Sequence, residues 1–390
     1  MRYRRFGNTG MEVSALGFGA MRLPTVDPTD RSTIDEAAAT RMVRYAIDHG
    51  VNYVDTAYPY HNGESERFVG RALRDGYREK VNLATKLPMW AMHEKGDAER
   101  ILSEQLEKLQ TDHIDFYLFH GLRKVRWEIV ESLDLLAWAD RVLADGRIRH
   151  IGFSFHDNYD VFKMIVDAFH WDFCQIQYNY MDIETQAGTK GLRYAAAKGL
   201  GVVIMEPMLG GRLVDPPQPV QDLWDTASTV QTPVERALRW LWDQPEVSVV
   251  LSGMSEMAHV VENVAHASAY GVGNMSDPDQ ALITQVRAQY EALCPIPCTK
   301  CEYCLPCTVD LNIPRLFDGF NRGAMYDKMQ EARDRYLRLS EEQRASACIA
   351  CRECEAKCPQ SIPISEWMVS LDEVLGRGVD LDACQMPSGV

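Results

Sequence analysis

The sequence lacks any long uncharged apolar run. A transmembrane helix needs about 20 consecutive apolar residues, and no segment of the 390-residue chain provides them. The N-terminal residues MRYRRFGNTG also lack the apolar core of a secretory signal. We therefore expect a cytoplasmic protein that has no membrane partner.

An excess of positive charge is absent too. The formal net charge is −15, which argues against non-specific binding to nucleic acids or anionic membranes. The composition, with 46% hydrophobic and 25% charged residues, is that of an ordinary soluble globular protein. For a chain of this length we predict one large domain followed by a smaller one.

No G-x-G-x-x-G turn follows any predicted strand, which disfavours a doubly wound sheet. After a hairpin-like opening, apolar segments alternate with amphipathic helical segments, one of which is expected to be a single helix over 128–144. The expected strands are 15–19, 51–55, 81–86, 114–119, 148–154, 173–177, 201–205 and 247–252. Eight strand–helix units within about the first 265 residues predict an α/β fold, the TIM (β/α)8 barrel.

Polar residues stand at the carboxyl ends of these strands. They are Asp55, Lys86, His120, Ser154, Gln177 and Glu206. In a barrel these strand ends converge on the one face that carries active sites. Any one of them alone could equally be a solvated or salt-bridged strand end, but complementary groups at four strand ends favour a shared site.

Three of these residues have complementary chemistry with Tyr60, which lies in the loop after Asp55. We expect Lys86 to pair with Asp55, because a buried charge is costly without a partner. The lysine should also lower the pKa of Tyr60 from its usual value of about 10. His120 can donate a hydrogen bond to a substrate oxygen. Such a set can protonate a carbonyl oxygen while a hydride arrives from a cofactor.

On these residues the sequence resembles the aldo/keto reductase family. The matching segments are Asp55-Thr56-Ala57 with Tyr60, Gly63-Glu64-Ser65-Glu66, Lys86, and Ile114-Asp115 through His120. The resemblance covers residues 1–270 and implies a TIM barrel that catalyses nicotinamide-dependent carbonyl reduction. It places the catalytic roles on Tyr60 as general acid and on Lys86, Asp55 and His120.

The resemblance also implies where NADH or NADPH binds. Ser154 and Gln177 match the positions that hold the nicotinamide amide, although Phe155 replaces the asparagine that usually follows. The other matching positions are Met205, Gly210, Gly211, Arg212, Ser252, Gly253, Glu262 and Asn263. NADPH-preferring members place a lysine and an arginine against the 2′-phosphate, where this chain has Gly253 and His259. Because that phosphate loses its strongest contacts without a cation, we expect NADH or dual use, unless Arg212 or another residue compensates.

Eight of the eleven cysteines crowd into two short tracts. The tracts read Cys298-x2-Cys301-x2-Cys304-x2-Cys307 and Cys348-x2-Cys351-x2-Cys354-x3-Cys358-Pro359. Such clustering in a cytosolic chain indicates metal ligation rather than disulfides, and the second tract has the bacterial ferredoxin spacing. We predict two [4Fe–4S] clusters in a small α-helical ferredoxin-like domain.

In two-cluster ferredoxins the fourth cysteine of a tract ligates the other cluster. On that rule one cluster is held by Cys298, Cys301, Cys304 and Cys358, and the other by Cys348, Cys351, Cys354 and Cys307. The first tract has one residue fewer before its last cysteine and Thr308 in place of proline, so the exchange stays open for Cys307. A pair of Zn(Cys)4 sites is the alternative.

We therefore expect a reductase barrel over residues 1–275, a linker and helix over 276–293, and a ferredoxin-like domain over 294–390. The expected activity is reversible reduction of a small aldehyde or ketone. The clusters would pass electrons to a protein partner, sense redox state or brace their domain, and the sequence shows no sign of a flavin. The alternative is an electron-transfer or redox-sensing protein whose barrel binds nucleotide without turnover. Trp90, which follows the Lys86 strand, is expected either to line the substrate pocket or to pack.

Overall fold

The structure is a computed structural model that describes residues 1–387, so residues 388–390 of the predicted ferredoxin-like domain lie outside it. The chain divides into two compact units. The first combines Met1–Gly210 with Val234–Ser276, and the second combines Gly211–Pro233 with the chain from Asp277 onward. We describe each unit by itself.

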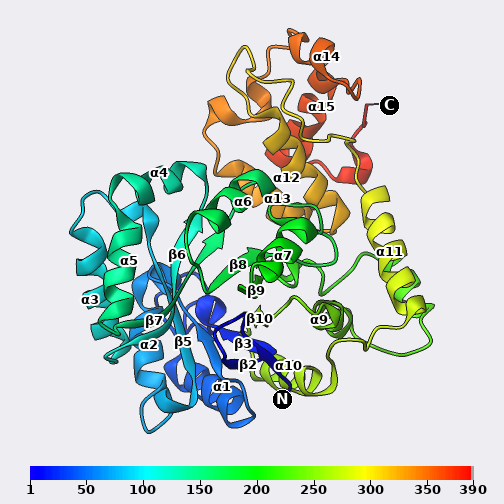
Figure 1. Ribbon diagram of the computed structural model, residues 1–390. Helices are drawn as coiled ribbons and strands as arrows, with labels where there is room; N and C mark the ends of the chain where they lie inside the picture. The colour runs from blue at the N-terminus through cyan, green and yellow to red at the C-terminus, as the bar shows by residue number, and fades with distance from the viewer. Residues whose placement is uncertain (388–390) are drawn as a thin grey trace. The chain divides into compact units, whose positions relative to one another are not determined.

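The first unit is a closed barrel of parallel strands (Figure 1). Around the barrel the order is β10-β3-β4-β5-β6-β7-β8-β9. The strands are β3 (Leu16–Gly19), β4 (Tyr53–Asp55), β5 (Asn82–Leu87), β6 (Ile114–Leu122), β7 (Ile148–Phe155), β8 (Phe173–Gln177), β9 (Gly201–Met205) and β10 (Val249–Ser252). The predicted TIM barrel is thereby confirmed, because β10 closes on β3 and leaves no open sheet edge.

Helices surround this barrel and bury one apolar face each. They are α1 (Glu36–Asp48), α2 (Ser65–Ala72), α3 (Asp97–Leu109), α4 (Lys124–Ser132), α5 (Leu135–Ala144), α6 (Tyr159–Ala168), α7 (Gly188–Ala197), α9 (Pro233–Asp243) and α10 (Met257–Ala269). The expected single helix over 128–144 is wrong. It is divided into α4 and α5 because Asp134 adopts a left-handed conformation, with φ of 56°, which a continuous helix does not allow.

Aromatic side chains fill the amino-terminal end of the barrel. The antiparallel strands β1 (Tyr3–Arg5) and β2 (Glu12–Ser14) form a hairpin there. Phe6 follows β1, and its ring centre lies 4.5 Å from that of Phe116 and 5.4 Å from that of Phe173. These rings are completely buried. Because side chains fill this end of the interior, an active site has room only at the opposite end, where the carboxyl ends of the strands lie.

The second unit is helical, as predicted. Its helices are α8 (Gln218–Asp225), α11 (Asp277–Ala292), α12 (Ile313–Met325), α13 (Met329–Leu337), α14 (Glu353–Lys357) and α15 (Ile364–Leu371). It has its own apolar core, in which the Phe320 ring lies 6.0 Å from that of Trp367. Segment 211–233 contributes α8, which packs against α11. Within residues 1–387, no helix has the length and apolar character needed to cross a membrane.

Candidate functional site

The structure brings the four predicted catalytic side chains to one end of the barrel. Asp55 ends β4, Lys86 lies near the end of β5, and His120 lies near the end of β6. These three strands are neighbours in the barrel. Tyr60 begins the short 3-10 helix that follows β4. Parallel strands thus deliver residues far apart in sequence to one place.

A buried ion pair lies at the centre of this group. Lys86 Nζ is 2.7 Å from both carboxylate oxygens of Asp55 and donates a further bond of 2.8 Å to the Thr56 carbonyl oxygen. The same nitrogen lies 3.5 Å from the Tyr60 hydroxyl. Both charged side chains are almost inaccessible to water. The cation is therefore held by two fixed partners and faces the phenol as its third.

The pKa values in this group follow from burial and from the ion pair. Burial alone would lower the pKa of Lys86, but Asp55 and Tyr60 together raise it above its ordinary value. Burial raises the pKa of Asp55 against the effect of Lys86. Burial likewise raises the pKa of Tyr60, and Lys86 opposes this only in part. The expected net lowering of the Tyr60 pKa is therefore wrong, because the sequence identified the cation but not the extent of burial.

His120 completes the group. Its ring lies edge-on to the Tyr60 ring, with 6.3 Å between the ring centres. Burial, followed by the charge of Lys86, holds the pKa of His120 well below its usual value. Among residues 1–387 its buried Nδ1 has no hydrogen-bond partner. The imidazole is thus neutral at pH 7, with a ring nitrogen left for a ligand or solvent.

The Tyr60 loop is held by a histidine that the sequence analysis missed. His61 Nδ1 lies 2.6 Å from the Arg31 carbonyl oxygen, and His61 Nε2 accepts a hydrogen bond of 3.2 Å from the Leu23 amide. His61 and Asn62 have φ of 52° and 55°, which is uncommon for residues other than glycine. This tight turn fixes the position of Tyr60, and no local pattern in the sequence indicates it.

The residues predicted to hold the nicotinamide amide already have partners within the barrel. Ser154 Oγ accepts a hydrogen bond of 2.7 Å from the Gly121 amide. Gln177 Nε2 donates to Asp182 at 2.6 Å, and Gln177 Oε1 accepts from Gln186 at 3.0 Å. Ser154 and Gln177 belong to the adjacent strands β7 and β8. Both side chains are in place at the carboxyl end of the barrel, but an amide ligand would have to exchange with these bonds.

Other predicted cofactor positions gather at the ends of β9 and β10. Met205 ends β9, Ser252 ends β10, and Asn263 Nδ2 donates to Ser252 Oγ at 3.1 Å. Among the described residues the buried Asn263 Oδ1 has no partner, whereas Glu262 is exposed. Arg212 belongs to the second unit, where it pairs with Glu331 at 3.5 Å.

Arg22 is a cation at this place that the sequence analysis did not identify. A side-chain carbon added to Gly253 would lie 3.2 Å from Arg22 Cδ, and one added to Gly210 would lie 3.6 Å from Arg22 Nη2. Gly210 has a positive φ of 72°, so its backbone leaves room for a close ligand. The guanidinium and the glycine backbone fit the phosphates of a dinucleotide. The only sequence signal is that Arg22 closely follows strand β3.

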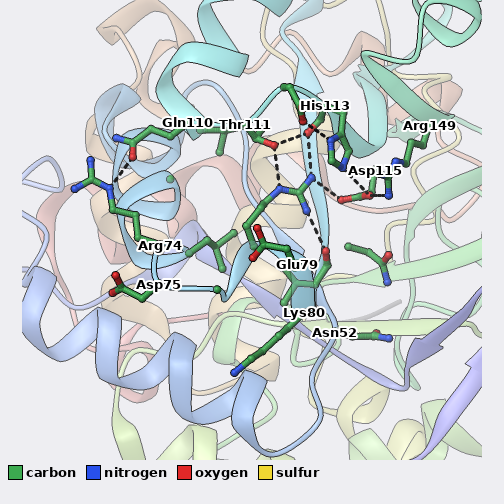
Figure 2. A pocket seen from close by; sticks show the side chains of 18 of the residues that line it. Asn52, Arg74, Asp75, Glu79, Lys80, Gln110, Thr111, His113, Asp115 and Arg149 are labelled. Atoms are coloured by element: carbon green, nitrogen blue, oxygen red, sulfur yellow. Dashed lines mark hydrogen bonds and ion pairs between the residues drawn. The ribbon is translucent and has the colours of Figure 1, made fainter.

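A cavity also lies at the amino-terminal ends of β5 and β6 (Figure 2). It measures about 1060 Å³. Buried Asp115 pairs there with Arg78 at 2.8 Å and with Arg149 at 2.9 Å, and it accepts a bond from the Leu83 amide. Figure 2 shows Asp115 and Arg149 next to each other on the wall of this cavity. Mutually satisfied charges on the amino-terminal face of a barrel indicate a structural role, so we place the active site at the opposite face.

The cysteines of the second unit fall into two groups. The thiols of one group line a small cavity together and consist of Cys298, Cys301, Cys304 and Cys358. In the other group, burial raises the pKa of the Cys354 thiol, and the neighbouring Glu355, Cys307 and Cys348 raise it further. Thr308 Oγ1, next to Cys307, lies 3.5 Å from Cys351 Sγ. Within the described part of the chain no three His, Cys, Asp or Glu side chains converge as for a single metal ion. Each group contains three cysteines of one tract and one cysteine of the other. This arrangement fits thiolate ligands spread around a cluster.

Comparison with known proteins agrees with this architecture. Residues 15–271 match the aldo/keto reductase family, and residues 297–362 match a 4Fe-4S dicluster domain. L-galactose dehydrogenase from Arabidopsis thaliana is 30% identical over 310 residues, which cover 74% of this chain and 94% of that protein. An uncharacterized oxidoreductase of Bacillus subtilis, YrpG, is 32% identical over 235 residues, which cover 55% of this chain and 68% of that protein.

A solved structure shows the same barrel. It is the holo form of the aldo-keto reductase AKR11C1 from Bacillus halodurans, with a TM-score of 0.62 and 26% identity. The alignment covers 73% of this chain and 96% of that one. The family match extends over most of the chain and contains all four residues of the buried group. The chain therefore belongs to the aldo/keto reductase family of oxidoreductases and carries a 4Fe–4S domain after its barrel.

Proposed function

We propose that the barrel catalyses the reversible reduction of an aldehyde or ketone with NADH or NADPH. The observation that supports this most strongly is the buried Lys86–Asp55 pair, whose ammonium group lies 3.5 Å from the Tyr60 hydroxyl. A phenol beside a permanent cation, with a neutral imidazole next to it, suits proton transfer to an oxygen that gains negative charge. A family match alone does not identify the reaction.

Each side chain has a distinct part in this proposal. The raised pKa of Tyr60 keeps the phenol protonated before reaction, so it can donate its proton to the carbonyl oxygen. Lys86 then stabilises the phenolate, and Asp55 keeps Lys86 charged and in position. His120 donates a hydrogen bond that orients the carbonyl oxygen. The nicotinamide, when bound, supplies or accepts the hydride.

The cofactor would lie along the carboxyl ends of β7 to β10. Ser154 and Gln177 would hold the nicotinamide amide, and Arg22 would contact the pyrophosphate. The remaining proposed contacts within the first unit are Met205, Gly210, Ser252, Gly253, Glu262 and Asn263, whereas Gly211 and Arg212 belong to the second unit and stay predictions from the sequence. Because Arg22 supplies a cation that does not depend on a 2′-phosphate, we propose that NADH and NADPH both bind.

We further propose that the second unit holds two [4Fe–4S] clusters with an exchanged fourth ligand. Cys358 lines the same small cavity as three cysteines of the other tract, which supports the ligand exchange for the first cluster. The proximity of Cys307 to Cys354 supports the exchange for the second cluster. Cys301 and Cys351 are exposed, so a corner of each cluster would be accessible to an electron-transfer partner. Absorbance near 400 nm that bleaches with dithionite, and about eight irons per chain, would support clusters of this type over zinc.

The reductase proposal is tested with a matched pair of tyrosine variants. Tyr60→Phe removes the proposed acid, whereas Tyr58→Phe removes a hydroxyl from the same loop that lies 3.3 Å from Glu104. We expect wild type and Tyr58→Phe to oxidise NADH or NADPH with a panel of carbonyls under anaerobic conditions. Tyr60→Phe should lose at least about 100-fold in kcat, the effect typical of a general acid. Full activity in Tyr60→Phe would contradict the proposal.

A further inference from the structure

A row of aromatic and basic side chains leads outward from the catalytic group. The Trp90 ring lies 5.0 Å from the His120 ring, and the Arg126 guanidinium lies 5.4 Å from the centre of the Trp90 ring. Trp90 is 42% exposed, so this aromatic surface borders solvent and does not belong to the core. Of the two roles expected for Trp90, a position beside the reacting group is the one that the geometry favours.

Arg126 is held in place by backbone groups. Arg126 Nη1 donates to the Gly121 carbonyl oxygen at 2.8 Å and to the His120 carbonyl oxygen at 3.3 Å. Gly121 has a positive φ of 64°, and a side-chain carbon at this glycine would lie 2.5 Å from Arg126 Nη1. The guanidinium therefore occupies space that only glycine leaves free, and it is fixed to the same backbone segment that carries His120.

No carboxylate within residues 1–387 lies within ion-pair distance of Arg126, so its remaining N–H groups face no anion of this part of the chain. Its neighbours Arg123 and Lys124 are exposed and basic, and the first turn of α4 contains no acidic residue. Asp157 is the nearby acid, but it accepts hydrogen bonds from the backbone amides of Lys124 and Asn158. The chain has a net charge of −15, yet positive charge is in excess here, next to His120. Such a place suits the binding of an anion.

We propose that Arg126 binds an anionic group on the carbonyl substrate, a carboxylate or a phosphate, while Trp90 packs against the carbon chain between that group and the carbonyl. This inference rests on the proposed reductase activity. A guanidinium fork matches either anion with two parallel hydrogen bonds, and the adjacent cations increase the rate at which an anion arrives. The substrate class is thus an oxo acid or a phosphorylated carbonyl compound whose anion is several bonds from the reacting carbon.

The test compares anionic and neutral aldehydes of matched shape. The carboxylate pair is 4-carboxybenzaldehyde and 4-methylbenzaldehyde, and the phosphate pair is glyceraldehyde 3-phosphate and glyceraldehyde. In wild type we expect kcat/KM for at least one anionic member to exceed that of its neutral match by about 10- to 100-fold, as one charged hydrogen-bond pair implies. Arg126→Met should lower kcat/KM for the anionic member about 10- to 100-fold more than for its neutral match, which abolishes this preference. Arg126→Lys, which keeps the charge but not the fork, should retain part of it.

The control variant is Arg141→Met, which removes one positive charge from the exposed surface of α5 and should leave both substrate pairs unchanged. A preference confined to one pair identifies carboxylate or phosphate as the anion. Equal kcat/KM for anionic and neutral members in wild type, or equal losses for both in Arg126→Met, would overturn the inference.

If no aldehyde is reduced, calorimetry separates the two proposals. Binding of 4-(hydroxymethyl)benzoate that is lost in Arg126→Met would support the anion site and reject the reductase activity. Absence of binding both of this carboxylate and of glycerol 3-phosphate would reject both proposals.

Discussion

Lys86 Nζ lies 2.7 Å from each carboxylate oxygen of Asp55, with both side chains buried between neighbouring strands. This ion pair has a structural and a chemical role. It joins the ends of β4 and β5, and it keeps a positive charge 3.5 Å from the Tyr60 hydroxyl. Water does not compete for the lysine, so its charge acts on the phenol with little screening.

The ion pair predicts a difference between single and double variants. Asp55→Asn leaves Lys86 buried without a counter-ion, which should reduce the free energy of unfolding by about 3–5 kcal/mol. The double variant Asp55→Leu with Lys86→Met removes both charges and should regain most of that stability, because well-packed apolar pairs can replace a buried ion pair. It should nevertheless remain inactive. Urea unfolding and turnover assays check this, and recovery of activity in the double variant would contradict the role of Lys86.

His120 predicts a loss of stability on acidification. Its pKa is far lower in the folded protein than in the unfolded chain, where it is about 6.5. Below about pH 6.5 the unfolded chain therefore takes up a proton that the folded protein does not, and the free energy of unfolding falls as the pH falls. Urea titrations of wild type and His120→Asn between pH 7.5 and 5 measure this. The wild type should lose more stability than the variant over this range, and parallel curves would contradict the prediction.

Arg22 predicts an effect on nucleotide binding that does not depend on the 2′-phosphate. Arg22→Met should raise the Kd of NADH and of NADPH about 10-fold each, as expected when one charged contact with the pyrophosphate is lost. Arg41→Met removes an equal charge from the exposed face of α1 and should leave both affinities unchanged. Fluorescence titration provides the Kd values. A loss confined to NADPH would show that Arg22 contacts the 2′-phosphate instead.

The exchanged ligands predict which cysteine variants resemble one another. Cys358→Ser should perturb the same cluster as Cys301→Ser, although the two residues belong to different tracts. Cys307→Ser should likewise perturb the same cluster as Cys351→Ser. Electron paramagnetic resonance of dithionite-reduced protein distinguishes the two clusters, with Cys174→Ser as a control because Cys174 is buried within β8. Pairing by tract, with Cys358→Ser matching Cys351→Ser, would contradict the exchange.

The sequence was most informative where a residue's position follows from regular structure. Strands β8 and β9 begin and end at the expected residues, because apolar runs between helices are strong signals. Lys86 and Asp55 could be paired from the sequence, since polar residues at the ends of parallel strands meet at one face.

Loop geometry and burial could not be predicted in the same way. Arg22 and Arg126 reach the site from segments after β3 and β6, where neither periodicity nor spacing fixes the direction of a side chain. The break at Asp134 depends on one residue in a left-handed conformation. The pKa of Tyr60 rises because the packed structure removes water from the phenol, which a list of neighbouring charges does not reveal.

The central claim is that Tyr60 donates the proton while hydride passes from a nicotinamide to a carbonyl carbon in this barrel. The most direct test uses nicotinamide deuterated at C4 and mass spectrometry of the alcohol formed from an aldehyde. Wild type and Tyr58→Phe should place one deuterium on the carbonyl carbon in each turnover, and Tyr60→Phe should form almost no alcohol. Alcohol without deuterium from either C4-deuterated epimer, or undiminished transfer in Tyr60→Phe, would contradict the account.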